Sequence, residues 1–538
     1  NANATIANVS FVGGGSGATA KAEITSAADV EALVGSTASI TTTGAVLVDA
    51  RLQGEKNHAN ARAEGGTGSI FAAVSVMLAQ ANVGGGVAAA LDGDVLGSSQ
   101  ITVQADGANN AEAHTLSVSL GAFAGAGAGS NATVTEDADV EARVGATASL
   151  TTSGALRVEA DGDNDASAES DMGSGGVVGV AGGSLFAIVG GGVKAELNGD
   201  VFGAGSVTVD ADGSNDAIAH AKAVSVGLVA GSGASAYSEV TDKADVEALV
   251  GSTASLTVPG AAVQVLATGD NNAVADGLGG SVSGVSIDVA LQTAKVGGGT
   301  KAAFDGTLVD ATVDAASLTV KALGENTADA HVVVFNVSIV GGGAGATANA
   351  EITSAADVEA LVGSTASIAT SGAVLVDARL QGQGNHANAR AEGGSGGVLA
   401  NVAIMLADAK VGGGIAAAID GDVLASSQIT VQADGEPTVG GKAAPGNNAE
   451  AHTTAATFSA AFAGAGAGSK SEVTQDADVE ARVGATASLT TSGALKVQAD
   501  GNNKATSESD MGSGSILVGA TGGSLSAIVS GGVKAELN

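Results

Sequence analysis

The chain has 538 residues, enough for several domains, but its composition excludes an ordinary globular core. It contains 84 Gly, 9 Phe, 1 Tyr, no Trp and no Cys, so the aromatic side chains that dominate most cores are nearly missing, and disulfide or thiol chemistry is excluded. The net charge of −35 argues against nucleic acid or an acidic membrane surface as a partner.

The first strongly patterned segment, residues 28–40 (ADVEALVGSTASI), recurs along the whole chain. Close copies begin at Ala28, Ala138, Ala244, Ala356 and Ala477, with a weaker copy between each pair, which gives a unit of about 55 residues in two alternating types. On a longer scale, residues 1–198 are echoed by roughly 329–538, with 199–328 between them. The chain starts and stops within a unit, so we expect residues 1–538 to be one continuous window on a longer tandem array.

Within a unit the hydrophobic period is two, as in half-buried strands. Between Val140 and Thr151, apolar and polar residues alternate, and a turn at Ser153–Gly154 leads to a second alternating strand. Two inward positions hold the same residue type in every unit: Val48, Val103, Val158, Val209, Val265, Val320, Val376, Val431 and Val497, then Ala50, Ala105, Ala160, Ala211, Ala267, Ala322, Ala378, Ala433 and Ala499. Such columns are typical of stacked repeats that share a continuous core.

An asparagine follows this strand in each unit, and we interpret it as a corner residue, because Asn tolerates the left-handed conformation of a turn. Stacked at the spacing of strands, the side-chain amides would form a hydrogen-bonded ladder. A row of ligand-binding amides is the functional alternative. The members are Asn57, Asn109, Asn164, Asn215, Asn271, Asn326, Asn385, Asn447 and Asn503.

Two of these predicted corners are rich in acidic residues, which makes calcium the one cofactor worth considering. Calcium prefers six to eight oxygen ligands, and short Gly-containing corners can supply several of them. Solvated acidic turns that keep a repetitive protein soluble are the alternative. The candidate ligands are Asp161, Asp163, Asp165, Asp210, Asp212 and Asp216.

Catalytic signals are weak, and we expect no enzyme activity. His114, His220, His331 and His452 each lie five residues after the asparagine of their unit, and His58 and His386 directly follow one. If one unit forms one coil, members of the first group are at least ~9–10 Å apart, too far to share a metal. No Ser-His-Asp or paired-carboxylate arrangement stands out from the repeats.

Three further segments depart from the simple pattern. Glycine–alanine runs, such as residues 121–130, favour strands whose facing sheets approach closely. Residues 173–193 carry no charge, but their glycine content and their second copy near residues 512–533 indicate strands and not a membrane span. Residues 436–446 (EPTVGGKAAPG) are interpreted as a corner insertion, which repeat proteins place on an exposed face.

These patterns predict an all-β fold, a parallel β-solenoid of about ten units with a core of Val, Ala and Gly. The sequence leaves open whether each unit forms one wide coil or two coils of ordinary size, although the long alternating stretches favour one wide coil.

Units such as residues 145–170 (GATASLTTSGALRVEADGDNDASAES) resemble the repeats of giant bacterial surface exoproteins, of the haemagglutinin-like and leukotoxin-like kind, which belong to the autotransporter and two-partner secretion class. The resemblance implies a right-handed β-helix and a location outside the cell or on its surface. We therefore expect a structural fibre, with the stalk of a large bacterial adhesin as the alternative. The expected partners are other copies of the chain docked head to tail, or covalent continuation of the repeat.

Overall fold

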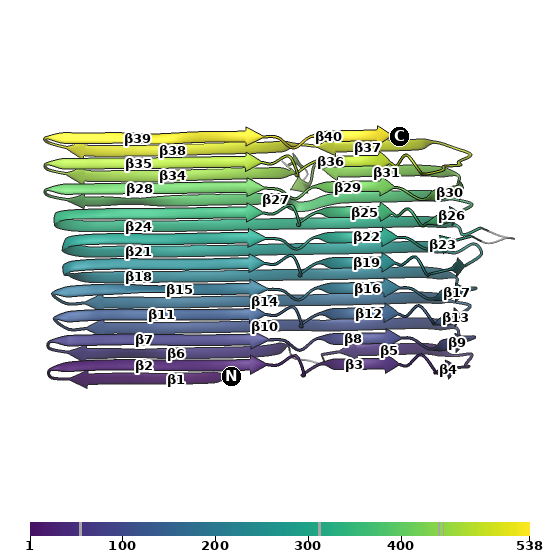
Figure 1. Ribbon diagram of the computed structural model, residues 1–538, viewed down its shortest axis with the longest axis horizontal. Helices are drawn as coiled ribbons and strands as arrows, with labels where there is room; N and C mark the ends of the chain where they lie inside the picture. The colour runs from purple at the N-terminus through teal and green to yellow at the C-terminus, as the bar shows by residue number, and fades with distance from the viewer. Residues whose placement is uncertain (53–55, 310–313, 440–441, 445) are drawn as a thin grey trace.

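The computed structural model describes residues 1–52, 56–309, 314–439, 442–444 and 446–538. Over these residues the chain winds into flattened coils stacked on one another, and ten parallel strands line one side of the stack (Figure 1). Val103 pairs with Val158, and Val158 with Val209, so each repeat unit forms one wide coil. The predicted parallel β-solenoid is confirmed. The described part of the chain contains no helix that is long and apolar enough to span a membrane.

Each coil begins with a long straight run of strand that we call the first limb. Successive first limbs pair in parallel and form half of the largest sheet. Its strands are β1 (Ala2–Ser10), β5 (Ala45–Arg51), β6 (Asn57–Ser69), β10 (Gln100–Leu120), β14 (Ala155–Gly175), β27 (Ala373–Gly397), β31 (Gln428–Gly435), β34 (Asn447–Ser459), β37 (Leu495–Gly501) and β38 (Asn503–Ser515).

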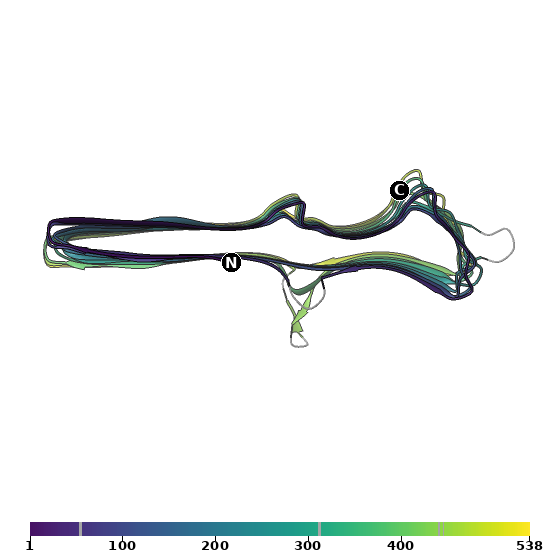
Figure 2. The ribbon, with the colours of Figure 1, turned by 90° about the horizontal axis from the view of Figure 1, so that it is seen from below.

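At the closed end of the coil the chain reverses and returns as the second limb, which faces the first limb (Figure 2). The second limbs are β2 (Gly13–Ile24), β7 (Ala72–Val83), β11 (Phe123–Val134), β15 (Val178–Val189), β28 (Ala400–Val411), β35 (Phe462–Val473) and β39 (Val518–Val529). Three strands continue through the closed end and supply both limbs, namely β18 (Ser206–Val240), β21 (Ala262–Val296) and β24 (Ser317–Ile352).

Beyond the second limb the coil widens and closes through short strands. A ten-stranded parallel sheet contains β3 (Val30–Val34), β8 (Val87–Leu91), β12 (Val140–Val144), β16 (Val193–Leu197), β19 (Val246–Val250), β22 (Thr300–Phe304), β25 (Val358–Val362), β29 (Ile415–Ile419), β36 (Val479–Val483) and β40 (Val533–Leu537). Two small sheets follow, made of β4 (Ser39–Ile40), β9 (Asp94–Leu96), β13 (Ser149–Thr151), β17 (Asp200–Phe202) and β20 (Leu256–Thr257), and of β23 (Thr307–Leu308), β26 (Ser367–Ala369) and β30 (Asp422–Ala425).

Two cores fill the coil, one in each half. Alanine dominates the narrow half between the limbs, which lets the two sheets approach closely (Figure 2), and Val, Leu and Ile fill the wider half. In the glycine–alanine strand β11, Ala124, Ala126 and Ala128 are buried, whereas Gly125 and the glycines that alternate with them face outward. The small alanine side chains therefore let the facing sheets approach closely, and the glycines lie on the outer surface.

The two unit types alternate because each supplies one partner of a repeated contact. In one type, Asp139 accepts a hydrogen bond from the backbone N–H of Gly192 in the next coil at 2.7 Å. Asp245 makes the same contact with Gly299 at 2.7 Å. Glycine is required there, because a Cβ on Gly192 would lie 2.9 Å from the carbonyl oxygen of Lys243 in the following coil.

Excursions from the coil occur immediately before the asparagine of the repeat. Strand β27 makes one through Gly382 and Gly384, whose φ angles of +54° and +73° favour glycine. Residues 436–446 form another, between β31 and β34, and they contain the antiparallel pair β32 (Thr438–Val439) and β33 (Lys442–Ala443). Residues 440, 441 and 445 of this insertion lie outside the described residues. The predicted corner is wrong, because the insertion interrupts a straight limb and projects from its outer face (Figure 2).

Candidate functional site

The asparagines of the repeat form one hydrogen-bonded row along the whole stack. The Nδ2 of each donates to the Oδ1 of the asparagine in the next coil, from Asn57 to Asn109 at 3.0 Å and onward to Asn503. Each Nδ2 also donates across the interior to a backbone carbonyl, for example from Asn109 to Ala138 at 3.0 Å and from Asn271 to Gly298 at 2.8 Å. The row therefore joins coil to coil and also joins the two walls of each coil.

The position of this row differs from the predicted corner. Asn109, Asn164 and Asn215 lie in the middle of long first-limb strands, and no described residue other than glycine has a positive φ. The asparagines point inward at the boundary between the two cores, where Asn109, Asn164, Asn215 and Asn271 are 0% exposed. A strand and not a turn therefore positions them. Their amides are paired with other protein groups, which leaves the ligand-binding alternative without accessible donors.

The acidic calcium candidates also lie on a straight strand and not in corners. Asp161, Asp163 and Asp165 are on β14, and Asp210, Asp212 and Asp216 are on β18. Register brings Asp161 beside Asp212, and Asp165 beside Asp216, on the outer face of the first limb. Asp210 instead pairs with Glu159, and Asp163 pairs with Ser214.

Like charges and partial burial shape the protonation of these rows. Burial, and then the charge of Asp212, raise the pKa of Asp210 to about 6. Burial also raises the pKa of Asp161 and that of Asp216, whose carboxylate accepts a hydrogen bond from Asn272. Lys56 Nζ bridges Asp163 Oδ2 and Asp165 Oδ2 at 2.6 and 2.9 Å.

The flat sheet limits what these carboxylates can bind. The two in-register pairs lie four residues apart along the strand, about 13 Å, so they cannot share one ion. Each pair alone offers at most four carboxylate oxygens, fewer than the six to eight that calcium prefers. Within the described ranges, no group of three or more His, Cys, Asp or Glu side chains is placed to hold a metal ion. The calcium prediction therefore depends on the pairs Asp161–Asp212 and Asp165–Asp216 with additional ligands from water.

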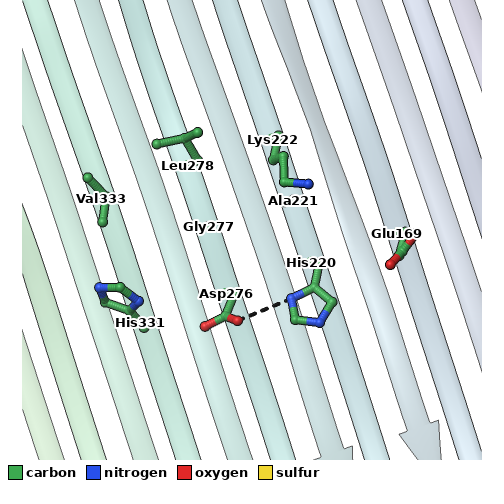
Figure 3. Close-up of a pocket in the computed structure, with 9 residues that line it drawn as sticks. All are labelled: Glu169, His220, Ala221, Lys222, Asp276, Gly277, Leu278, His331 and Val333. Atoms are coloured by element: carbon green, nitrogen blue, oxygen red, sulfur yellow. Dashed lines mark ion pairs between the residues drawn. The ribbon is translucent and has the colours of Figure 1, made fainter.

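A histidine–carboxylate row runs along the same outer face (Figure 3), and sequence reasoning missed its acidic members. His114, His220, His331 and His452 occupy alternate coils, as expected, and the coils between them carry Glu169, Asp276 and Arg390 at the same register position. The recurrence of acidic residues at this position of the repeat was the signal available in the sequence.

Contacts within the row are ion pairs between neighbouring coils. His220 Nδ1 lies 3.2 Å from Asp276 Oδ2, and His452 Nε2 lies 3.0 Å from Glu508 Oε2. The hydrogen bond to Asp276 raises the pKa of His220. In the other histidine group, burial lowers the pKa of His386, whose Nδ1 lies 2.9 Å from Asn448 Nδ2.

The described lining of the shallow groove over this row contains no hydroxyl or thiol nucleophile. Its described lining residues are Glu169, His220, Ala221, Lys222, Asp276, Gly277, Leu278, His331 and Val333, and none of these is Ser, Thr or Cys. A histidine–aspartate pair without a hydroxyl or thiol cannot perform nucleophilic catalysis of the triad kind. The arrangement can stabilise neighbouring coils through charge pairs that strengthen when the histidines are protonated.

Comparisons of the chain with protein-family models, with curated proteins and with solved structures yield no match.

Proposed function

We propose that this chain is a structural segment of an extracellular or cell-surface fibre, whose function resides in its length and rigidity. The observation that carries the proposal is the asparagine row, in which every member from Asn57 to Asn447 donates a hydrogen bond to the asparagine of the next coil. Combined with continuous parallel sheets, it connects neighbouring coils along the stack at the same positions. Such a rod resists bending and local opening, because each coil is held by both neighbours.

Head-to-tail docking of copies would continue the stack. Leu185 and Val189, which neighbouring coils cover on both sides, are 1% and 0% exposed, and Leu525 and Val529 occupy the same inward positions of β39. In a docked pair the first coil of a second copy would cover this surface, since strand edges pair readily with one another.

Microscopy and light scattering of residues 1–538 test this proposal. We expect rods that lengthen with protein concentration and show an axial repeat of ~4.8 Å. Leu525→Glu places a charge on the inward surface of the last coil and should stop growth, whereas Ser524→Glu, on the outward surface of the same strand, should not. A monomer at all concentrations would rule out docking of copies and leave only covalent continuation.

A second candidate function is the stalk of a large bacterial adhesin. One feature favours it, because the hairpin β32–β33 projects from the outer face of the first limb, and repeat proteins often bind through such insertions. A stalk predicts isolated rods that end in a distinct head on the native cell, whereas a structural fibre predicts continuous filaments.

A further inference from the structure

Next to the closed end of the coil, the outer surfaces of the narrow half are apolar although the chain carries a net charge of −35. We call this part of the outer face of the first limb, between the histidine–carboxylate row and the closed end, the front face, and the corresponding part of the outer face of the second limb the back face (Figure 2). Exposed apolar side chains on the back face are Val74 (52%), Ile287 (68%) and Ile404 (52%), and on the front face Leu120 (58%), Val337 (52%) and Phe458 (70%). Exposed apolar side chains that form a contiguous patch usually mark an interaction site.

In one row along each face, glycine alternates from coil to coil with Val, Ile, Phe or Ala. On the front face, one row reads Ala7, Gly66, Val118, Gly173, Val224, Gly280, Phe335, Gly394, Ala456 and Gly512. On the back face, the corresponding row reads Gly15, Val74, Gly125, Val180, Gly231, Ile287, Gly343, Val402, Gly464 and Ala520. The large residues form ridges on odd-numbered coils in front and on even-numbered coils behind.

Packing within one molecule explains the glycines but not the ridges. Large side chains lean over the neighbouring glycine, and a Cβ on Gly280 would lie 2.3 Å from Cζ of Phe335. The ridge side chains nevertheless stay about half exposed, as Val402 does at 49%. A threonine would fit the same strand position without presenting an apolar surface to water, so the apolar ridges call for a partner.

We propose that copies of this chain associate side by side, with the front face of one molecule packed on the back face of the next. Because these two rows carry their apolar residues on opposite coils, two parallel copies at equal height place each apolar residue of one row opposite a glycine of the other row. Front-to-front packing of parallel copies at equal height would instead place ridge on ridge. The proposal goes beyond the proposed function, since a fibre without lateral neighbours would leave that function intact.

The area and the lack of charge of the two faces are compatible with a second copy of the chain as the partner. The charge-free strip on the front face is two outward positions wide and ten coils tall, roughly 13 by 48 Å, so a pair of faces buries about 1,200 Å², at the lower end of stable interfaces. This area grows with every further coil. A membrane is a poorer partner, because 2% aromatic residues and the strongly acidic surface lack the aromatic and basic anchors of membrane-binding surfaces.

Sedimentation velocity across a range of salt concentrations tests the association. Salt screens the repulsion between acidic molecules, so we expect lateral assembly to increase with NaCl. The test uses the Leu525→Glu background, which cannot grow axially. In this background Val402→Glu should lower the sedimentation coefficient to that of the monomer at every salt concentration. Leu47→Glu is the matched control, because Leu47 is 60% exposed but lies outside both faces of the narrow half, and it should assemble like the parent chain. Equal behaviour of the two variants would overturn the proposal.

Cross-linking tests the front-to-back geometry. Because the chain has no native Cys, only the introduced cysteines react with the cross-linker. Val282→Cys marks the front face and Ile287→Cys the back face of the same coil. A bis-maleimide should link the two proteins when mixed, and neither protein alone. Dimers of the Val282→Cys protein alone would overturn the arrangement. A third outcome would identify a membrane as the partner in place of a second copy. In that case the parent chain binds phosphatidylcholine vesicles, Val402→Glu abolishes this binding, and no lateral assembly occurs at any salt concentration.

Discussion

The asparagine row makes a prediction whose size can be worked out from the contacts of one residue. Asn271 is 0% exposed and takes part in three hydrogen bonds: it accepts from Asn215 at 2.9 Å and donates to Asn326 at 2.9 Å and to Gly298 at 2.8 Å. Asn271→Ala removes all three and leaves two buried acceptors without their donor. At about 1–3 kcal/mol for each of the two unsatisfied acceptors, we expect a loss of about 2–6 kcal/mol.

The neighbouring residue provides the control. Asn272 lies on the outer face of the same strand and donates one partly buried hydrogen bond to Asp216 at 2.9 Å, so Asn272→Ala should cost under about 1 kcal/mol. Guanidinium unfolding followed by circular dichroism, with hydrogen exchange of the flanking coils, measures both variants. In a stack held by nearest neighbours, exchange should rise first around the altered coil. Equal unfolding midpoints for the two variants would refute an energetic role of the row.

Three further outcomes are expected. Val158→Asp buries a charge at a position that is 0% exposed and should lower the melting temperature strongly, whereas Glu159→Lys, beside Asp210 on the outer face, should change stability by under about 0.5 kcal/mol. Equal melting temperatures of the two variants would contradict the assignment of Val158 to the inside and Glu159 to the outside. Burial raises the pKa of Asp210, Asp245 and Asp357 to about 6 from 3.8, so between these two values the folded state binds more protons than the unfolded state, and stability should fall as the pH rises. The melting temperature should therefore be higher at pH 5 than at pH 7.5. Asp357→Asn keeps the acceptor for the N–H of Gly414 but cannot ionise, so it should reduce this difference. If the pairs Asp161–Asp212 and Asp165–Asp216 bind calcium, EDTA should lower the melting temperature and millimolar calcium should restore it, and identical curves would leave these acids as solubilising charge.

Much of the fold could be predicted because the repeat compares many copies of each position. The Val and Ala columns identified the inward face, and residues such as Val158 and Ala160 are buried as expected. The period of two could not show where a strand ends, so the number of coils per unit stayed open. Only the register of Val103 with Val158 decides it.

The sequence-based prediction of a corner relied on the turn propensity of asparagine and ignored its place in the alternation of inward and outward residues. In uninterrupted units it follows the inward alanine by four residues, as Asn109 follows Ala105, and an even spacing keeps a strand residue on the same face. Tertiary pairing then overrides propensity, since an inward Asn gains hydrogen bonds from both neighbouring coils. The acidic segments after Ala160 and Ala211 were misplaced for the same reason.

The alternation of coil types also limits how the gene for this protein can change in length. A coil with the aspartate of the Asp139 type needs a glycine N–H of the Gly192 type in the coil that follows. Loss of a single coil would set two like coils against each other, with no donor for the aspartate and with ridges stacked on ridges along both faces. Duplication or loss in pairs of coils preserves the aspartate–glycine contact and the alternation of the ridges, so the smallest heritable change in the length of the stack is two coils and not one.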